Sequence, residues 1–154
     1  MVDYSLKLLG SFQFEDPSSQ SDRFESDKVR ALLAFLATDP RAYHRETLAA
    51  LLWPEKPEQK ARHDLSQALY NMRHVTAVNL EGVFDVTART VQFIPNERFK
   101  VDVLEFEQSL QVVEGHQHPQ SILCDDCRRQ LAAAIALYRG EFLAGLYVAD
   151  STVL

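Results

Sequence analysis

The sequence has few cysteines and no long apolar run, and it lacks the common catalytic motifs. Two cysteines in 154 residues are too few for a disulfide framework. No apolar run approaches the length that crosses a bilayer, and the first residues lack the cationic flank of a secretory signal. The chain has no glycine-rich phosphate loop, no HExxH and no GxSxG. We therefore expect a soluble cytoplasmic protein that is not an enzyme, requires no cofactor and has no membrane partner.

The chain is also short of positive charge, which at first argues against a nucleic-acid binder. Its formal net charge is −6, whereas phosphate contacts need lysine and arginine. The charges are unevenly distributed, however. Residues 56–74 hold four lysines and arginines against two carboxylates, and residues 97–127 hold two against seven. A basic surface can therefore exist on an acidic chain.

Hydrophobic residues make up 46% of the sequence, enough for the core of one domain, or of one small domain plus part of another. Alternation at Tyr4, Leu6 and Leu8, with Phe12 and Phe14 beyond Gly10–Ser11, predicts a short strand pair. Ser26 is then suited to cap a helix that ends near Thr38–Asp39–Pro40.

Two further helices, at about residues 46–52 and 57–75, flank a proline-rich break. Trp53–Pro54 ends the first, and Pro57 suits the first position of the second. The second helix has an apolar stripe with helical spacing. Its members are Ala61, Leu65, Ala68, Leu69 and Met72. The pair has the layout of a helix-turn-helix unit, in which one helix supports another that enters the DNA major groove.

The pattern changes to a period of two after Gly82, and becomes helical again near residue 102. Phe84, Val86, Val91 and Phe93 alternate with polar residues around a turn at 87–90, which predicts a β-hairpin. Asp102 and Glu105 resemble a capping box at the start of the next helix. A last long helix is expected to run to Tyr138–Arg139, with Gly140 as its C-cap.

The polar face of the helix at 57–75 carries the residue types that read DNA. Arginine and lysine donate to guanine or phosphate, glutamine and asparagine pair with adenine, and serine and tyrosine suit phosphate. The candidates are Lys60, Arg62, His63, Ser66, Gln67, Tyr70, Asn71 and Arg73. Any solvated helix face carries similar residues, but the order of support helix, break and hairpin favours the DNA-binding interpretation. Asp64 should point away from phosphate or pair with a cation.

Four further residues are candidates for phosphate or groove contacts. Arg89 lies at the predicted hairpin tip, where it either enters the minor groove or is an ordinary exposed turn residue. Arg41, His44 and Arg45 lie around the start of the support helix, where free N–H groups can hold a phosphate. His44 also occupies the N-cap position, so its role can be local.

Six segments together resemble the SARP-type bacterial transcriptional activators. They are LLGSFQF, KVRALLAFLATDP, RETLAALLWP, ARHDLSQALYNMR, VDVLEFE and ALYRGEFLAG, and they span nearly the whole chain. The resemblance implies an α+β fold: an OmpR-type winged helix-turn-helix at residues 1–97, then the start of a TPR-like helical activator domain at 98–154. It implies sequence-specific binding to double-stranded DNA, with RNA polymerase contact or self-association through the helical part. Because such helical domains need several stacked pairs, we expect a fragment of a longer regulator or an unusually short member.

A second group of residues has the chemistry of a metal site. His116, His118, Cys124 and Cys127 form an HxH followed by a CxxC. Imidazole and thiolate are the ligands of tetrahedral zinc. Three interpretations stay open from the sequence: structural zinc, a disulfide, and unliganded residues where a loop meets a helix.

A rival function also follows from composition. The acidic balance of the C-terminal third is compatible with a protein-interaction or oligomerisation module that does not itself bind DNA.

Overall fold

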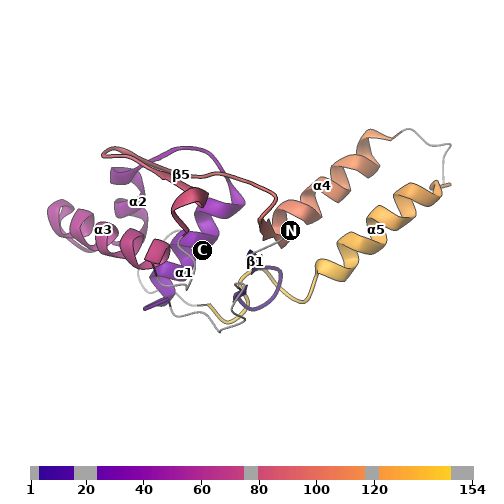
Figure 1. Cartoon of the computed structure of the whole chain (residues 1–154). Coiled ribbons are helices and arrows are strands. Elements are labelled where there is room, and N and C mark those ends of the chain that lie inside the picture. The colour runs from indigo at the N-terminus through magenta and orange to yellow at the C-terminus, as the bar shows by residue number, and fades with distance from the viewer. Residues whose placement is uncertain (1–3, 16–23, 75–79, 117–121, 147–154) are drawn as a thin grey trace.

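The structure is a computed structural model that describes residues 4–15, 24–74, 80–116 and 122–146. This described part contains five α-helices and two small sheets, so the expected α+β class is confirmed. Figure 1 shows α1, α2 and α3 with β5 in one lobe, and α4 and α5 as a helical hairpin that extends away from it. The helices are α1 (Asp27–Thr38), α2 (Arg45–Leu52), α3 (Glu58–His74), α4 (Asp102–Gly115) and α5 (Asp125–Leu137).

The cap of α1, the end of α2 and the start of α3 lie at or within one residue of the predicted positions. The Ser26 side chain caps α1 by accepting a hydrogen bond from the Val29 amide at 3.3 Å. The C-cap of α2 is Trp53, which is 7% exposed and belongs to the core. The Pro57 carbonyl accepts from the Ala61 amide at 2.9 Å, so the proline directly precedes the first turn of α3.

The predicted stripe on α3 is buried along its whole length. Its five members, from Ala61 to Met72, are each at most 3% exposed and pack into one apolar cluster with α1 and α2. Seven of the twelve residues of α1 are buried as well. Burying these side chains fixes which face of α3 is left for solvent or a partner.

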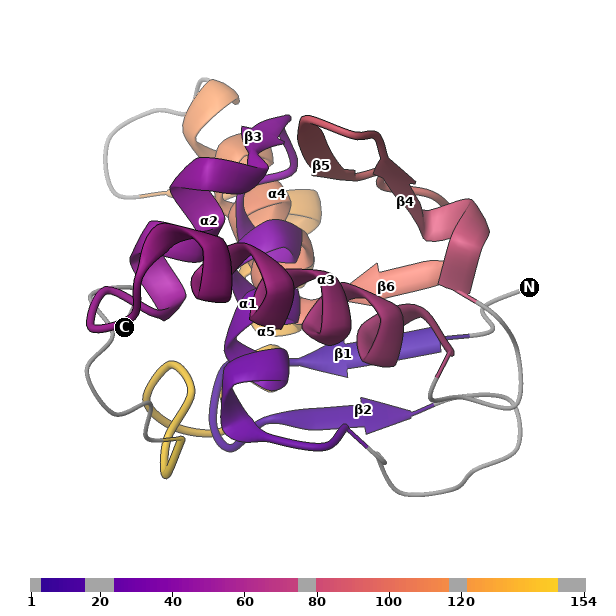
Figure 2. The same cartoon turned by 90° about the vertical axis from the view of Figure 1, so that its left-hand side faces the viewer.

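The strands form two three-stranded sheets. In the first, β1 (Tyr4–Lys7) pairs antiparallel with β2 (Gln13–Glu15) and parallel with β6 (Phe99–Val101), with Leu6 opposite both Phe14 and Val101. Figure 2 shows these three strands side by side. The predicted strand pair is confirmed, and β6 is a third strand that the sequence did not indicate.

The second sheet contains the predicted hairpin. Its strands β4 (Phe84–Val86) and β5 (Thr90–Phe93) are antiparallel, and a 3₁₀ turn at Leu80–Val83 precedes them. A short third strand, β3 (Tyr43–His44), pairs with β5 just before α2 begins. The hairpin is thereby hydrogen-bonded to the N-terminus of the support helix.

Asp102 corrects one expectation about the fourth helix. Helix α4 begins at Asp102, but its N-cap is Val101 and no side chain caps it. The Asp102 carboxylate is buried and instead accepts the backbone N–H groups of Leu8 and Leu9, each at 2.9 Å. These amides follow the end of β1, and the buried carboxylate satisfies their hydrogen-bonding needs instead of capping the helix.

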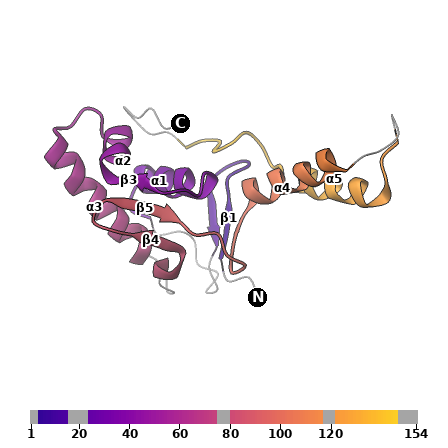
Figure 3. The same cartoon turned by 90° about the horizontal axis from the view of Figure 1, so that it is seen from above.

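The last helix ends earlier than the sequence indicates. Its C-cap is Tyr138, not Gly140. The chain leaves the helix because the Arg139 amide donates to the Leu9 carbonyl at 3.0 Å, which returns this segment to the first sheet. Figure 3 shows α4 and α5 extending together away from the other helices. None of the described helices is both long and apolar enough to cross a membrane.

Candidate nucleic-acid interface

The predicted reading face of α3 is largely open to solvent. Asn71 and Arg73, near the end of the helix, are half-buried, and the other six candidates are exposed. Those six are Lys60, Arg62, His63, Ser66, Gln67 and Tyr70. Among the described residues, Lys60, His63 and Gln67 have no hydrogen-bond or ion-pair partner. Their donors and acceptors are therefore available to a ligand.

Arg62 is held by two carboxylates. Its Nη2 lies 2.5 Å from Glu46 Oε1 on α2 and 2.7 Å from Glu58 Oε1 one turn earlier on α3. The guanidinium is half exposed, at 50%, and both carboxylates are more than 70% exposed. Exposed pairs of this kind contribute about 0–1 kcal/mol each, so a phosphate or a guanine edge can displace them at little cost.

Arg45 links three elements. Its Nη1 donates to the Thr87 carbonyl at 3.1 Å, its Nη2 donates to Ser66 Oγ at 2.8 Å, and its backbone N–H donates to the Arg89 carbonyl at 2.8 Å. The first residue of α2 thus connects the hairpin turn to α3. This role fixes the spacing between hairpin and helix, whichever ligand binds there.

The hairpin tip is an ordered turn. Thr87 Oγ1 accepts from the backbone amides of Arg89 and Thr90, at 3.1 and 2.8 Å. Arg89 is exposed at the predicted tip. These hydrogen bonds fix the backbone of the turn and therefore the position from which the Arg89 side chain extends.

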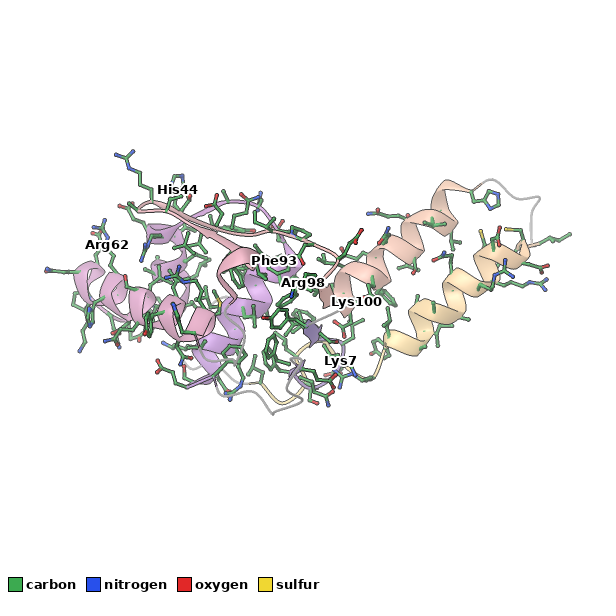
Figure 4. All side chains as sticks on the ribbon, viewed as in Figure 1. Lys7, His44, Arg62, Phe93, Arg98 and Lys100 are labelled. Carbon is green, nitrogen blue, oxygen red and sulfur yellow. The ribbon has the colours of Figure 1, made fainter. Side chains whose placement is uncertain are left out.

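These residues surround a groove of about 610 Å³ between the start of α2, the middle of α3 and the hairpin tip. Three arginines line it against one carboxylate, Glu46, so the groove is locally basic on an acidic chain. Its polar lining comprises His44, Arg45, Glu46, Arg62, Ser66 and Arg89. Figure 4 shows His44 and Arg62 on the end of the molecule opposite to α4 and α5, whereas Lys7, Arg98 and Lys100 lie near the middle.

Other predicted residues serve contacts of their own. Asn71 Oδ1 accepts from the Glu25 amide at 3.1 Å, and Arg73 Nε donates to the Leu69 carbonyl at 3.4 Å. The Tyr70 ring stacks on His74, with ring centroids 4.3 Å apart, and stays 63% exposed. The structure therefore gives Asn71 a local role that the sequence did not indicate.

Arg41 is turned towards its own neighbours. Its Nε lies 3.0 Å from the Tyr43 hydroxyl and 3.0 Å from Asp39 Oδ2, with the guanidinium over the Tyr43 ring. The hydrogen bond to Tyr43 and the negative charge of Asp39 raise the pKa of Arg41 above its ordinary value. Arg41 does not line the groove.

Asp64 pairs with a cation, which is one of the two outcomes that the sequence predicts. Its carboxylate pairs with Lys56 from the α2–α3 turn. The hydrogen bond from Lys56, together with the charges of Lys56, Lys60 and His63, lowers the pKa of Asp64 below its ordinary value. The negative charge of Asp64 is thus balanced by a lysine that lies just before the same helix.

The sequence did not predict that Glu46 pairs with Arg62, or that Ser66 accepts a hydrogen bond from Arg45. The spacing of four between Glu58 and Arg62 could have predicted their pair, since such residues are neighbours on a helix. Nothing in the sequence indicates that Glu46 reaches the same guanidinium from another helix, or that Ser66 faces Arg45.

Three of the four predicted metal-binding residues lie together. The ligand atoms of His116, Cys124 and Cys127 are all within 4.8 Å of one another. His116 Nδ1 lies 3.2 Å from each sulfur, and neither cysteine is in a disulfide. Burial, then the hydrogen bond and charge of Cys124, raise the pKa of the Cys127 thiol. His118 lies outside the described residues.

Comparisons with known proteins show a shared fold. No protein-family model and no curated protein sequence matches the chain. Among solved structures, the fold is similar to that of Mycobacterium tuberculosis EmbR in complex with a low-affinity phosphopeptide. The TM-score is 0.67 at 23% sequence identity, over 94% of this chain and 38% of the EmbR chain. The chain therefore spans well under half of the EmbR chain, and its described architecture is one that EmbR contains.

Proposed function

We propose that this chain is the double-stranded-DNA-binding part of a bacterial transcriptional regulator of the SARP kind, acting in the cytoplasm. In this proposal residues 1–97 are an OmpR-type winged helix-turn-helix. Helix α3 enters the major groove, α2 supports it and the β4–β5 hairpin is the wing. Residues 98–154 begin a helical activator domain that contacts RNA polymerase or a second copy. The fold shared with EmbR, a SARP-family regulator, supports the assignment.

One observation carries the proposal: the basic groove between α2, α3 and the hairpin tip. The groove brings Arg45, Arg62 and Arg89 together from three separate segments. Lys60, His63 and Gln67 add exposed donors on the same helix as Arg62. A bidentate contact from arginine to guanine is worth about 1–3 kcal/mol, which is comparable to or larger than the about 0–1 kcal/mol contributed by each of the two exposed ion pairs of Arg62.

The first test is binding to random duplex DNA, measured by fluorescence anisotropy at two salt concentrations. We expect affinity to fall steeply with salt, by a log–log slope of about 0.9 for each phosphate neutralised. No binding even at low salt would favour the rival function, a protein-interaction module. The acidity of the α4–α5 region supports that rival.

Matched substitutions then locate the surface. We expect Lys60→Ala with Arg62→Ala, and separately Arg89→Ala, to weaken binding while the fold is kept, because all three side chains are exposed. Lys100→Ala and Arg129→Ala are controls that remove the same charges from β6 and α5. Equal losses from test and control variants would contradict the proposed groove face.

Glu46→Gln provides a test with the opposite sign. This change removes one of the two carboxylates that pair with Arg62 and keeps the shape of the side chain. We expect DNA affinity to rise a few-fold, since an exposed pair is worth up to about 1 kcal/mol. An unchanged or lower affinity would contradict the proposal that Glu46 competes with DNA for Arg62.

A further inference from the structure

The far end of the α4–α5 hairpin contains a cluster of soft metal ligands that DNA binding does not use. His116 is the C-cap of α4, and Cys124 is the N-cap of α5. Cys127 lies in the first turn of α5 and is 1% exposed. Figure 1 shows this end of the hairpin pointing away from the lobe that contains α3.

We propose that His116, Cys124 and Cys127 bind one Zn²⁺ ion that joins the end of α4 to the start of α5. One imidazole nitrogen and two sulfurs are a donor set that zinc prefers, and hard cations such as Mg²⁺ or Ca²⁺ do not. Water or a further donor completes the tetrahedron. The proposal does not depend on the function proposed above.

The distances fit this ion without a change in the backbone. Zinc bonds of about 2.3 Å to sulfur and 2.0–2.1 Å to nitrogen separate neighbouring tetrahedral donors by about 3.6 Å. His116 Nδ1 lies 3.2 Å from each of the two sulfurs, and all three donors lie within 4.8 Å of one another. Small side-chain rotations therefore bring the three atoms to bonding distance from a common centre.

The start of α5 also contacts one of the two sulfurs. The Cys127 backbone N–H donates to Cys124 Sγ at 3.4 Å, and the sulfur lies at the N-terminus of α5. Binding replaces each thiol proton with a sulfur–zinc bond and releases the proton to the buffer.

Packing explains what the ion would contribute. Of the thirteen residues of α5, only Cys127 and Ala134 are buried, and of the fourteen of α4 only Asp102 and Val103. Three of these four lie far from the end of the hairpin, so apolar burial holds that end weakly. A metal that bridges residues 116 and 127 restricts this end in the way a short cross-link does.

The experiment measures zinc in the full chain. The protein is purified with Zn²⁺, desalted and analysed for metal, and we expect about one zinc per chain. His116→Ala and Cys124→Ser should each weaken Zn²⁺ binding by more than about 100-fold, since loss of an outer-shell partner alone costs about 10- to 100-fold. His74→Ala, which removes an imidazole from α3, is the matched control and should keep the metal.

Cobalt binding to the wild-type chain tests the same site without any substitution. Metal-free wild-type chain titrated with Co²⁺ should show thiolate-to-cobalt charge transfer and the visible bands of a tetrahedral ion. Zn²⁺ should then displace the Co²⁺ and remove both sets of bands. Wild-type protein that retains no zinc and gives no such bands would overturn the proposal. So would a Cys124→Ser, Cys127→Ser double variant that stays folded by circular dichroism and keeps its zinc.

Discussion

The lobe formed by α1, α2 and α3 and the hairpin formed by α4 and α5 are both helical, but they are stabilised differently. Helix α1 buries seven of its twelve residues, and α3 buries an apolar stripe along its whole length. Helix α5, of similar length to α1, buries two of thirteen residues, and its Ile135 is 72% exposed. Helices with similar amphipathic patterns therefore contribute unequally to stability, because the contribution depends on what covers the apolar face.

The α4–α5 hairpin is instead attached at its base by specific polar contacts. Asp102 accepts the amides of Leu8 and Leu9 at one side. At the other, the Leu143 amide donates to the Leu8 carbonyl at 2.8 Å and the Gly10 amide donates to the Glu141 carbonyl at 3.0 Å. Both sets of bonds converge on the residues that follow β1, so this segment connects the two regions.

Gly10 is required at that junction. Its φ is +124°, a conformation that residues with a side chain rarely adopt. A Cβ there would lie 3.0 Å from Cβ of Arg139, whose Nη2 donates to the Ser11 carbonyl at 2.8 Å. The absence of a side chain lets the two segments approach each other.

The largest expected effect contrasts the two regions directly. Leu65→Ala on α3 should destabilise the fold by about 2–5 kcal/mol, because the side chain is fully buried and leaves a cavity. Ile135→Ala on α5 should change stability by less than about 0.5 kcal/mol. Urea unfolding followed by circular dichroism measures both. A large loss of stability from Ile135→Ala would show that this face of α5 is covered in solution, and would contradict the difference in stabilisation between the two regions.

A smaller effect is expected where the two regions join. Asp102→Asn should cost about 1.5–3 kcal/mol, because the amide gives weaker bonds to the Leu8 and Leu9 N–H groups and brings an NH₂ group near them. In this variant, the rates of backbone amide hydrogen exchange should rise more in α4 and α5 than in α3. Asp85→Asn, at an exposed position on β4, is the control. Uniform acceleration in all helices would indicate that the regions unfold as one unit.

The smallest effect concerns a surface carboxylate in the first lobe. The pKa of Asp64 is lowered chiefly by its hydrogen bond from Lys56, so its contribution to stability is present above the pKa of the unfolded chain. The contribution is lost as the pH falls through the lower pKa of the folded state. Lys56→Met should raise the pKa of Asp64 towards its ordinary value, which a carboxyl NMR titration measures. An unchanged pKa would mean that Lys56 is not its partner in solution.

Local patterns in the sequence predicted most of the elements. The Ser26 cap, the break at Trp53–Pro54 and the stripe on α3 depend on neighbouring residues, so their structural outcome could be read directly. Strand β6 could not be predicted, because its partner β1 lies about ninety residues earlier. The role of Asp102 was mistaken for the same reason: a capping pattern is local, and the amides that bind it belong to the N-terminal segment.

The candidate sites divide in the same way. The sequence identified Arg45, Arg62 and Arg89 as cations, and His116, Cys124 and Cys127 as metal ligands, from residue type and spacing. Whether they act as DNA and zinc contacts stays a prediction. The tertiary structure decided that the three arginines border one groove, that Glu46 pairs with Arg62 and that Asn71 contacts Glu25. Residue chemistry and helical period are properties of short segments, whereas these contacts join segments that only folding brings together.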